Sequence, residues 1–102
     1  MNNYKKLSDN EVETKLKETK NWKIENNKLC KSFEFKNFIQ AFGFITKIAL
    51  ESEKLDHHPE LFNVFNKVNI FLSTHEINGL SEYDFILAKK IDSLKKYSII
   101  TY

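Results

Sequence analysis

The sequence predicts an α+β domain in which three helices lie on one face of a four-stranded antiparallel sheet, in the order α-β-β-α-β-β-α. Apolar residues recur at helical spacing in three segments, and they alternate with polar residues in four short segments that Asn-containing turns join in pairs. A hairpin alone is only marginally stable, so the two predicted hairpins are expected to join into one sheet. A chain of 102 residues has room for one core, so residues 1–102 are predicted to form a single domain.

The first helix is predicted from a capping box. Ser8 stands at the N-cap position and Glu11 at the third helical position, where each side chain can bind the other residue's backbone N–H. Leu7 and Val12 have the spacing of a hydrophobic staple around this start. The helix is expected to end at about Thr19.

The first hairpin follows directly. Trp22 and Ile24 alternate with polar residues, and Asn26-Asn27 predicts a turn because Asn tolerates positive φ. One face of the second strand is expected to carry Leu29, Lys31, Phe33 and Phe35.

The second helix is expected to begin after Asn37 and to end near residues 55–57, because Pro59 disfavours helical geometry just before it. Its predicted inner stripe is Phe38, Ala41, Phe42, Ile45, Ile48, Ala49 and Ser52. Phe44 and Leu50 fall outside this stripe. A helix that is apolar on more than one side is buried on more than one side, so this helix predicts a subunit interface and a homo-oligomer.

The second hairpin is predicted from residues 61–65, a turn at Asn66-Lys67 and a strand over residues 68–75. Strand alternation separates its two faces. One face has Val68, Ile70, Leu72 and Thr74, and the other has Asn69, Phe71, Ser73 and His75.

The last helix is predicted from a second capping box, Ser81 with Asp84, after a bend that Gly79 permits. Leu80 and Phe85 form its staple. Its inner stripe is predicted to be Phe85, Ala88, Ile91 and Leu94.

Composition excludes several classes of protein. The net charge is only +2 and the lysines are interleaved with acidic residues, so we expect no direct binding of nucleic acid. No apolar run approaches the ~20 residues of a membrane span, and the first residues lack the apolar core of a signal peptide, which predicts a cytoplasmic protein, with the nucleus left open. Cys30 is the single cysteine, which excludes an intrachain disulfide and a closed Cys-based zinc site.

The histidines are the strongest functional signal. His57, His58 and His75 all lie within 19 residues, at the predicted ends of a helix and a strand. Imidazole changes charge near neutral pH and can donate or accept a proton there. Glu53 precedes His57 by one helical turn and is expected to pair with it, and Asp56 adds a carboxylate.

Each of these residues also has a structural explanation taken singly. A histidine near a helix C-terminus is favoured by the helix dipole, and Asp84 could serve only its capping box. The adjacent pair His57-His58 before Pro59, with the third histidine close behind, favours a site.

These residues belong to a longer pattern. It runs through residues 53–60, 62–64, 72–76 and 79–82 to Asp84, with Ala41-Phe42-Gly43-Phe44, Trp22 and Phe33-Glu34-Phe35 before it. The pattern resembles the signature of the pterin-4a-carbinolamine dehydratases and covers the chain from about Leu7 to Ile91.

The resemblance implies the same layered fold, a homotetramer or homodimer, and a reaction without a metal or organic cofactor. The site residues that it implies are Glu53, Asp56, His57, His58, His75 and Asp84. The chain departs from the animal pattern at Leu61, where a Trp often lines the pocket, and at Tyr83, where an Arg is common.

The implied reaction is loss of water from a 4a-hydroxytetrahydropterin to give a quinonoid dihydropterin, which recycles the tetrahydropterin. It needs an acid for the leaving hydroxyl and a base for the ring N5 proton. The sequence interpretation assigns these tasks to His57 and His75, with His58 holding and polarising the pterin. Glu53 would orient His57, and Asp84 would fix the local geometry.

Two other functions fit parts of the pattern. Animal members of this family also resemble dimerisation cofactors of a homeodomain transcription factor, a role that needs no catalytic histidine. Three histidines with a carboxylate could also bind catalytic zinc, although adjacent side chains such as His57 and His58 diverge.

Overall fold

The computed structural model of the chain describes residues 4–96. Three α-helices, four strands and one short 3-10 helix alternate along it. They are α1 (Asp9–Lys17), β1 (Lys23–Glu25), β2 (Lys28–Glu34), α2 (Phe38–Leu55), β3 (Glu60–Val64), β4 (Lys67–Leu72), η1 (His75–Ile77) and α3 (Glu82–Lys96). This confirms the predicted α+β order.

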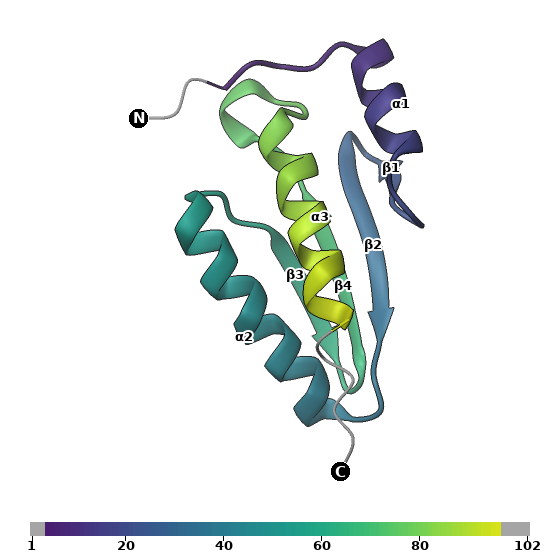
Figure 1. The fold of residues 1–102 in the computed structure, drawn as a ribbon, viewed down its shortest axis with the longest axis vertical. Helices are drawn as coiled ribbons and strands as arrows, with labels where there is room; N and C mark the ends of the chain where they lie inside the picture. The colour runs from purple at the N-terminus through teal and green to yellow at the C-terminus, as the bar shows by residue number, and fades with distance from the viewer. Residues whose placement is uncertain (1–3, 97–102) are drawn as a thin grey trace.

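The four strands form one antiparallel sheet in the order β1-β2-β4-β3, so the second hairpin pairs with the first through β4. The helix α3 crosses in front of the sheet, α2 packs against α3, and α1 lies near the upper end of β2 (Figure 1). The register places Phe33 opposite Val68 and Leu29 opposite Leu72. The ends of β2 and β4 that hold this second pair lie near the C-terminal end of α2 and the N-terminal end of α3 (Figure 1).

The predicted start of α1 is confirmed in detail. The Glu11 N–H donates to Ser8 Oγ over 3.1 Å, and the Ser8 N–H donates to Glu11 Oε1 over 2.8 Å. The helix ends at Lys17, slightly before the expected Thr19, and the Thr19 hydroxyl donates to the carbonyl of Leu16 instead of continuing the helix.

The core lies between the sheet and the helices. The alternation predicted for the second strand of this hairpin is confirmed within β4, since Val68, Ile70 and Leu72 are fully buried. The strand is shorter than the predicted residues 68–75, because β4 ends at Leu72 and His75 begins η1. The inner stripe of α3 is confirmed as well, with Ala88 and Ile91 fully buried. The Trp22 ring packs edge-on against Phe33, and its Nε1 donates to Asp92 of α3 over 3.0 Å, which ties the first hairpin to that helix.

The predicted inner face of α2 is wrong by part of a turn. Its buried residues are Ala41, Phe44, Ile48 and Ser52. Phe44 is 1% exposed and packs against Phe33 and Phe35, whereas Phe38 and Phe42 are about half exposed. Only part of the apolar surface of α2 packs against the sheet, and the remaining apolar residues of this helix face outward. Leu50 lies outside the buried stripe, as predicted.

Two turns differ from the predictions. The β3–β4 loop is Phe65-Asn66, one residue earlier than expected, since Val64 pairs with Lys67. Phe65 has a φ of 51° there. The bend before α3 takes its left-handed residue at Asn78, with a φ of 50°, whereas Gly79 meets the side chain of Lys6, whose Cε would lie 2.7 Å from a Cβ at that position.

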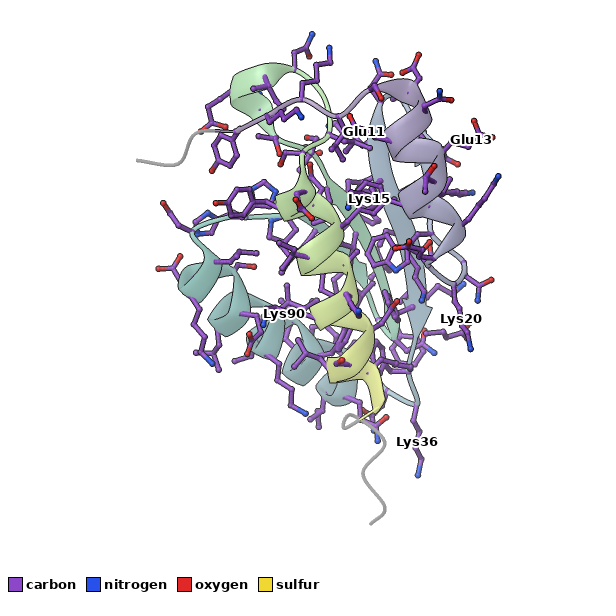
Figure 2. The ribbon with its side chains drawn as sticks, turned by 45° about the horizontal axis from the view of Figure 1, so that its top comes forward. Glu11, Glu13, Lys15, Lys20, Lys36 and Lys90 are labelled. Atoms are coloured by element: carbon purple, nitrogen blue, oxygen red, sulfur yellow. The ribbon has the colours of Figure 1, made fainter. Side chains whose placement is uncertain are left out.

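Charged side chains are distributed over the surface with both signs interleaved (Figure 2). Lys15 pairs with Glu82 over 3.3 Å and joins α1 to α3, and Lys90 approaches Glu51 to within 3.8 Å and joins α3 to α2. In the part of the chain that the structure describes, none of the helices has the length and apolar character needed to cross a membrane.

Candidate active site

The predicted site residues gather where α2 ends and α3 begins. Asp56 caps α2 in the left-handed conformation, with a φ of 53°, and its N–H bonds the carbonyls of Glu53 and Ser52. The His57 N–H also donates to the Ser52 carbonyl, over 3.1 Å. This turn gives the two adjacent histidines opposite surroundings: His57 is buried and His58 is exposed.

His57 forms a buried pair with Asp84. Its Nε2 lies 2.6 Å from Asp84 Oδ1, and the two residues are 5% and 0% exposed. The sequence predicted that Asp84 fixes geometry in this region, and the structure makes it the direct partner of His57. The expected pairing of Glu53 with His57 is wrong, because the C-cap turn directs His57 away from α2 and toward α3.

The other oxygen of Asp84 is held by two further donors. Thr74 Oγ1 donates to Oδ2 over 2.8 Å, and the N–H of Ser81 donates to the same oxygen over 2.9 Å. Thr74 Oγ1 also lies 2.6 Å from Ser81 Oγ. All three residues are at most 1% exposed, so this network is screened from water.

Two tyrosines border His57. Its ring centroid lies 6.1 Å from that of Tyr4 and 6.0 Å from that of Tyr83. The two tyrosines meet edge to face at 5.2 Å. The segment that carries Tyr4 is tied to the start of α3 by the Leu7 N–H, which donates to the Leu80 carbonyl over 2.8 Å. Tyr83 therefore occupies a position next to the buried pair.

His58 has a different carboxylate partner. Its Nε2 lies 2.6 Å from Glu53 Oε2, and these side chains are 55% and 77% exposed. Glu53 thus contacts the second histidine instead of the first. A contact this exposed contributes little to stability.

A groove of about 300 Å³ opens beside His58. Its lining includes Ser73, Thr74, His75 and Gly79, which lie in the segment between β4 and α3. The volume is at the lower end of the range for small-molecule sites. Two accessible imidazoles therefore share one groove, and Thr74 connects that groove to the buried Asp84.

A larger hollow, of about 670 Å³, lies elsewhere, between α1, β2 and α3. It holds none of the three histidines. Its polar groups largely bind one another: Lys31 lies 2.7 Å from Asp92, and Lys15 pairs with Glu82. The histidine groove is smaller but is the one with groups that transfer protons near neutral pH.

The arrangement of the side chains does not support the zinc alternative. Among residues 4–96, no group of three or more His, Cys, Asp and Glu side chains is placed to hold a metal ion. His57 and His58 face different carboxylates, Asp84 and Glu53. Adjacent histidines that diverge in this way do not converge on one ion.

Two network residues were given no site role on the sequence. Thr74 and Ser81 were part of the family pattern, but Thr74 was otherwise placed only on one face of the predicted strand and Ser81 only in a capping box. The signal for Thr74 was available: a hydroxyl on the buried face of a strand needs a partner, and Asp84 is a short acid in the next element. The remaining predicted residue, Asp56, is exposed and contributes the left-handed turn.

Known proteins share this arrangement of fold and sequence. Residues 5–94 match the family model described as pterin 4 alpha carbinolamine dehydratase. The chain belongs to this family, and the dehydratase class predicted from the sequence is confirmed by it. Two relatives bear the name "Putative pterin-4-alpha-carbinolamine dehydratase". The one from Solibacter usitatus is 46% identical and covers 87% of this chain and 94% of the relative. The other, from Prochlorococcus marinus, is 48% identical and covers 89% and 95%.

Solved structures agree. A transcriptional coactivator/pterin dehydratase from Brucella melitensis superposes with a TM-score of 0.85 at 39% identity, over 88% of this chain and 98% of that one. A pterin dehydratase-like RuBisCO assembly factor of the alpha-carboxysome has a TM-score of 0.60 at 26% identity, over 72% and 84%. The fold therefore supports functions other than dehydration in some relatives.

Proposed function

We propose that this chain removes water from a 4a-hydroxytetrahydropterin in the groove that His58 and His75 share, and so helps to recycle a tetrahydropterin. The observation that carries the proposal is that two accessible imidazoles line one small groove in a member of this family. Imidazole can act as acid and as base near neutral pH, which is what this dehydration requires.

The reaction balances without an oxidant or reductant. One imidazolium gives a proton to the 4a-hydroxyl as the C4a–O bond breaks and water leaves. The N5 electron pair forms the C4a=N5 double bond, and a neutral imidazole accepts the N5 proton. The product is the quinonoid dihydropterin, and the two imidazoles have exchanged protonation states.

The three histidines differ in whether a substrate in the groove could reach them. His58 and His75 line the groove and are the residues that would touch the substrate there. His57 stays in the catalytic set, but it is buried and bound to Asp84. Asp84 in turn accepts a hydrogen bond from Thr74, which lines the groove. The burial of His57 favours His58 over it as the partner of His75 in proton transfer, which revises the pairing proposed from the sequence.

A direct dehydration assay tests this proposal. Freshly prepared 4a-hydroxytetrahydropterin is mixed with the protein in EDTA, and its loss is followed by absorbance. The unmodified protein should accelerate dehydration, and His58→Ala and His75→Ala should each lower the rate by about 10²–10⁴-fold. Glu13→Ala, an exposed change on α1, is the matched control and should keep the rate. Absence of acceleration by the unmodified protein, or normal rates in both histidine variants, would refute the proposal.

We also propose that the protein is a homo-oligomer, at least a dimer and a tetramer by family resemblance. Support comes from the outer face of α2, where Phe38, Ile39, Phe42 and Leu50 are 49–75% exposed. Apolar patches of this kind mark interfaces in soluble proteins. Gly43 lies in the same helix, where a glycine costs about 1 kcal/mol relative to alanine. Nothing within this chain requires a glycine there, because a Cβ at Gly43 would meet open space. A second subunit that approaches α2 closely would explain it.

Light scattering with variants tests the assembly. Phe42→Glu should reduce the particle size and preserve helical circular dichroism, because Phe42 is half exposed. Ile86→Glu changes an apolar residue on α3 that is 37% exposed and should leave the size unchanged. An unmodified protein that is monomeric at micromolar concentration would contradict the proposal.

A second candidate function is that of a protein-binding cofactor. The exposed face of α2 favours it, and the Brucella structure carries the name of a coactivator as well as a dehydratase. The groove histidines separate the two functions. A role limited to protein binding would survive His58→Ala and His75→Ala and would be lost in Phe42→Glu.

A further inference from the structure

Two buried hydroxyl groups form a chain that ends on the Asp84 carboxylate. Thr74 Oγ1 donates its single proton to Asp84 Oδ2, so the 2.6 Å contact with Ser81 requires Ser81 Oγ to donate to Thr74. The order of donation is therefore fixed from Ser81 to Thr74 to Asp84. Neither hydroxyl has a place in the proton transfers described above.

The carboxylate receives three donors in all. Oδ2 accepts from the Thr74 hydroxyl and from the Ser81 N–H, and Oδ1 faces His57 Nε2 at 2.6 Å. An aspartate is ordinarily ionised near neutral pH, and an ionised carboxylate is an acceptor only. His57 Nε2 must then carry a hydrogen. When the ring is neutral, its Nδ1 is therefore the nitrogen with a free electron pair.

We propose that Thr74 is a positioning residue that fixes His57 as the Nε2–H tautomer. By holding Oδ2, the Thr74 hydroxyl prevents the carboxylate from rotating about χ2, so that Oδ1 stays directed at the imidazole. Ser81 supports this by holding the hydroxyl of Thr74. The claim that this geometry matters for turnover rests on the proposed dehydration, whereas the tautomer itself does not.

Other groups also lie close to His57. Tyr4 and Tyr83 contact the ring from the N-terminal segment and from α3, with centroids about 6 Å away. On α2, Glu53 has its carboxylate 2.6 Å from His58. In the described part of the chain, Asp84 is thus the acidic group bound to His57, and its orientation depends on Thr74.

The test compares Thr74→Val with Thr74→Ser. Valine has nearly the shape of threonine but no hydroxyl, whereas serine keeps the donor. Nitrogen-15 NMR of the histidine rings, titrated to their neutral form, reports the tautomer of His57, and the dehydration assay gives kcat and KM. Ile70→Val, a buried change on β4, the strand that precedes Thr74, controls for a general loss of packing.

In the unmodified protein and in Thr74→Ser, His57 should show the Nε2–H tautomer. Thr74→Val should give a mixture of tautomers and a kcat lower by about 10- to 100-fold, the scale of one hydrogen bond to a charged group, with KM little changed. Ile70→Val should preserve both readouts. If Thr74→Val does not fold, Ser81→Ala, which removes the donor to Thr74, should shift the tautomer in the same direction.

Three results would overturn the proposal: an Nδ1–H tautomer in the unmodified protein, an unchanged tautomer in the folded Thr74→Val variant, or a serine variant as impaired as the valine variant. An inactive unmodified protein that still shows the Nε2–H tautomer and its dependence on Thr74 would refute the dehydration but not the positioning.

Discussion

Two helices of this chain begin with nearly the same pattern, a serine followed three residues later by an acid, yet the two acids have different partners. At α1 the box is complete: Ser8 and Glu11 exchange both hydrogen bonds at the surface. At α3 half of it is redirected. The Ser81 N–H still donates to Asp84, but the Ser81 hydroxyl lies 2.6 Å from Thr74.

Burial accounts for the difference. Glu11 reaches back to its own N-cap at the surface of the protein. Asp84 is 0% exposed and reaches its N-cap with Oδ2, which leaves Oδ1 for His57. The same local pattern therefore predicts the start of a helix in both places, while the surrounding strands and helices decide which start becomes part of a site.

The largest effect should come from replacing the acid of the buried box. Asp84→Asn offers His57 an amide N–H where it had a carboxylate, which favours the wrong tautomer. We expect the dehydration rate to fall by about 10²–10⁴-fold, because an Asp→Asn change that gives a histidine the wrong tautomer can lower kcat by about 10⁴-fold. Glu11→Gln, the equivalent change in the exposed box, should keep the rate. Equal rates in the two variants would remove the functional distinction between the boxes.

The two capping boxes should also differ strongly in how much they contribute to the free energy of unfolding. Asp84→Ala leaves Thr74, the Ser81 N–H and His57 without their common buried acceptor. Breaking a buried pair in this way costs about 3–5 kcal/mol in the free energy of unfolding. Urea denaturation at neutral pH measures it. A loss below about 1 kcal/mol would mean that water or another group replaces the carboxylate.

The fold was largely predictable because its signals are local. The helix starts, the hairpins and the alternation of β4 follow from caps, Asn turns and period-two patterns. The inner face of α2 was not, because its sequence is apolar around most of its circumference. Only the packing of Phe44 against Phe33 and Phe35 in the sheet decides which side is buried.

The candidate site was predictable as a set of residues but not as a set of pairs. Glu53 and His57 are one helical turn apart, which predicts a contact only while the helix continues. Asp56 ends α2 in a left-handed turn, so His57 turns toward Asp84 and His58 meets Glu53 instead. The sequence could indicate that the Thr74 hydroxyl needs a buried partner, but its pairing with Asp84 depends on how the segment after β4 lies against the start of α3.

A smaller effect is expected at the first serine. Ser8→Ala removes the acceptor for the Glu11 N–H at the start of α1, and loss of an N-cap side chain costs about 1 kcal/mol. The rate of dehydration should not change, since α1 contributes no residue to the histidine groove. Urea denaturation and the rate assay on the same preparation check both parts. A rate loss in Ser8→Ala would mean that the exposed box also supports the site.

The smallest expected effect is a pH dependence confined to the exposed box. The backbone N–H of Ser8, with its hydroxyl second, holds the pKa of the Glu11 carboxyl below its ordinary value. A carboxyl whose pKa is lower in the folded state adds stability above its unfolded pKa, which is about 4.3, and this addition is lost as the pH falls through the folded-state pKa. The unmodified protein should therefore be slightly more stable than Glu11→Gln at neutral pH, and the difference should vanish in strong acid.

Urea denaturation of both proteins from about pH 7 to about pH 2.5 measures this difference in stability. The contribution of Asp84 to the pH dependence cancels, because Asp84 is present in both proteins. A difference that stays constant over this range would show that Glu11 stabilises α1 without any contribution from its charge.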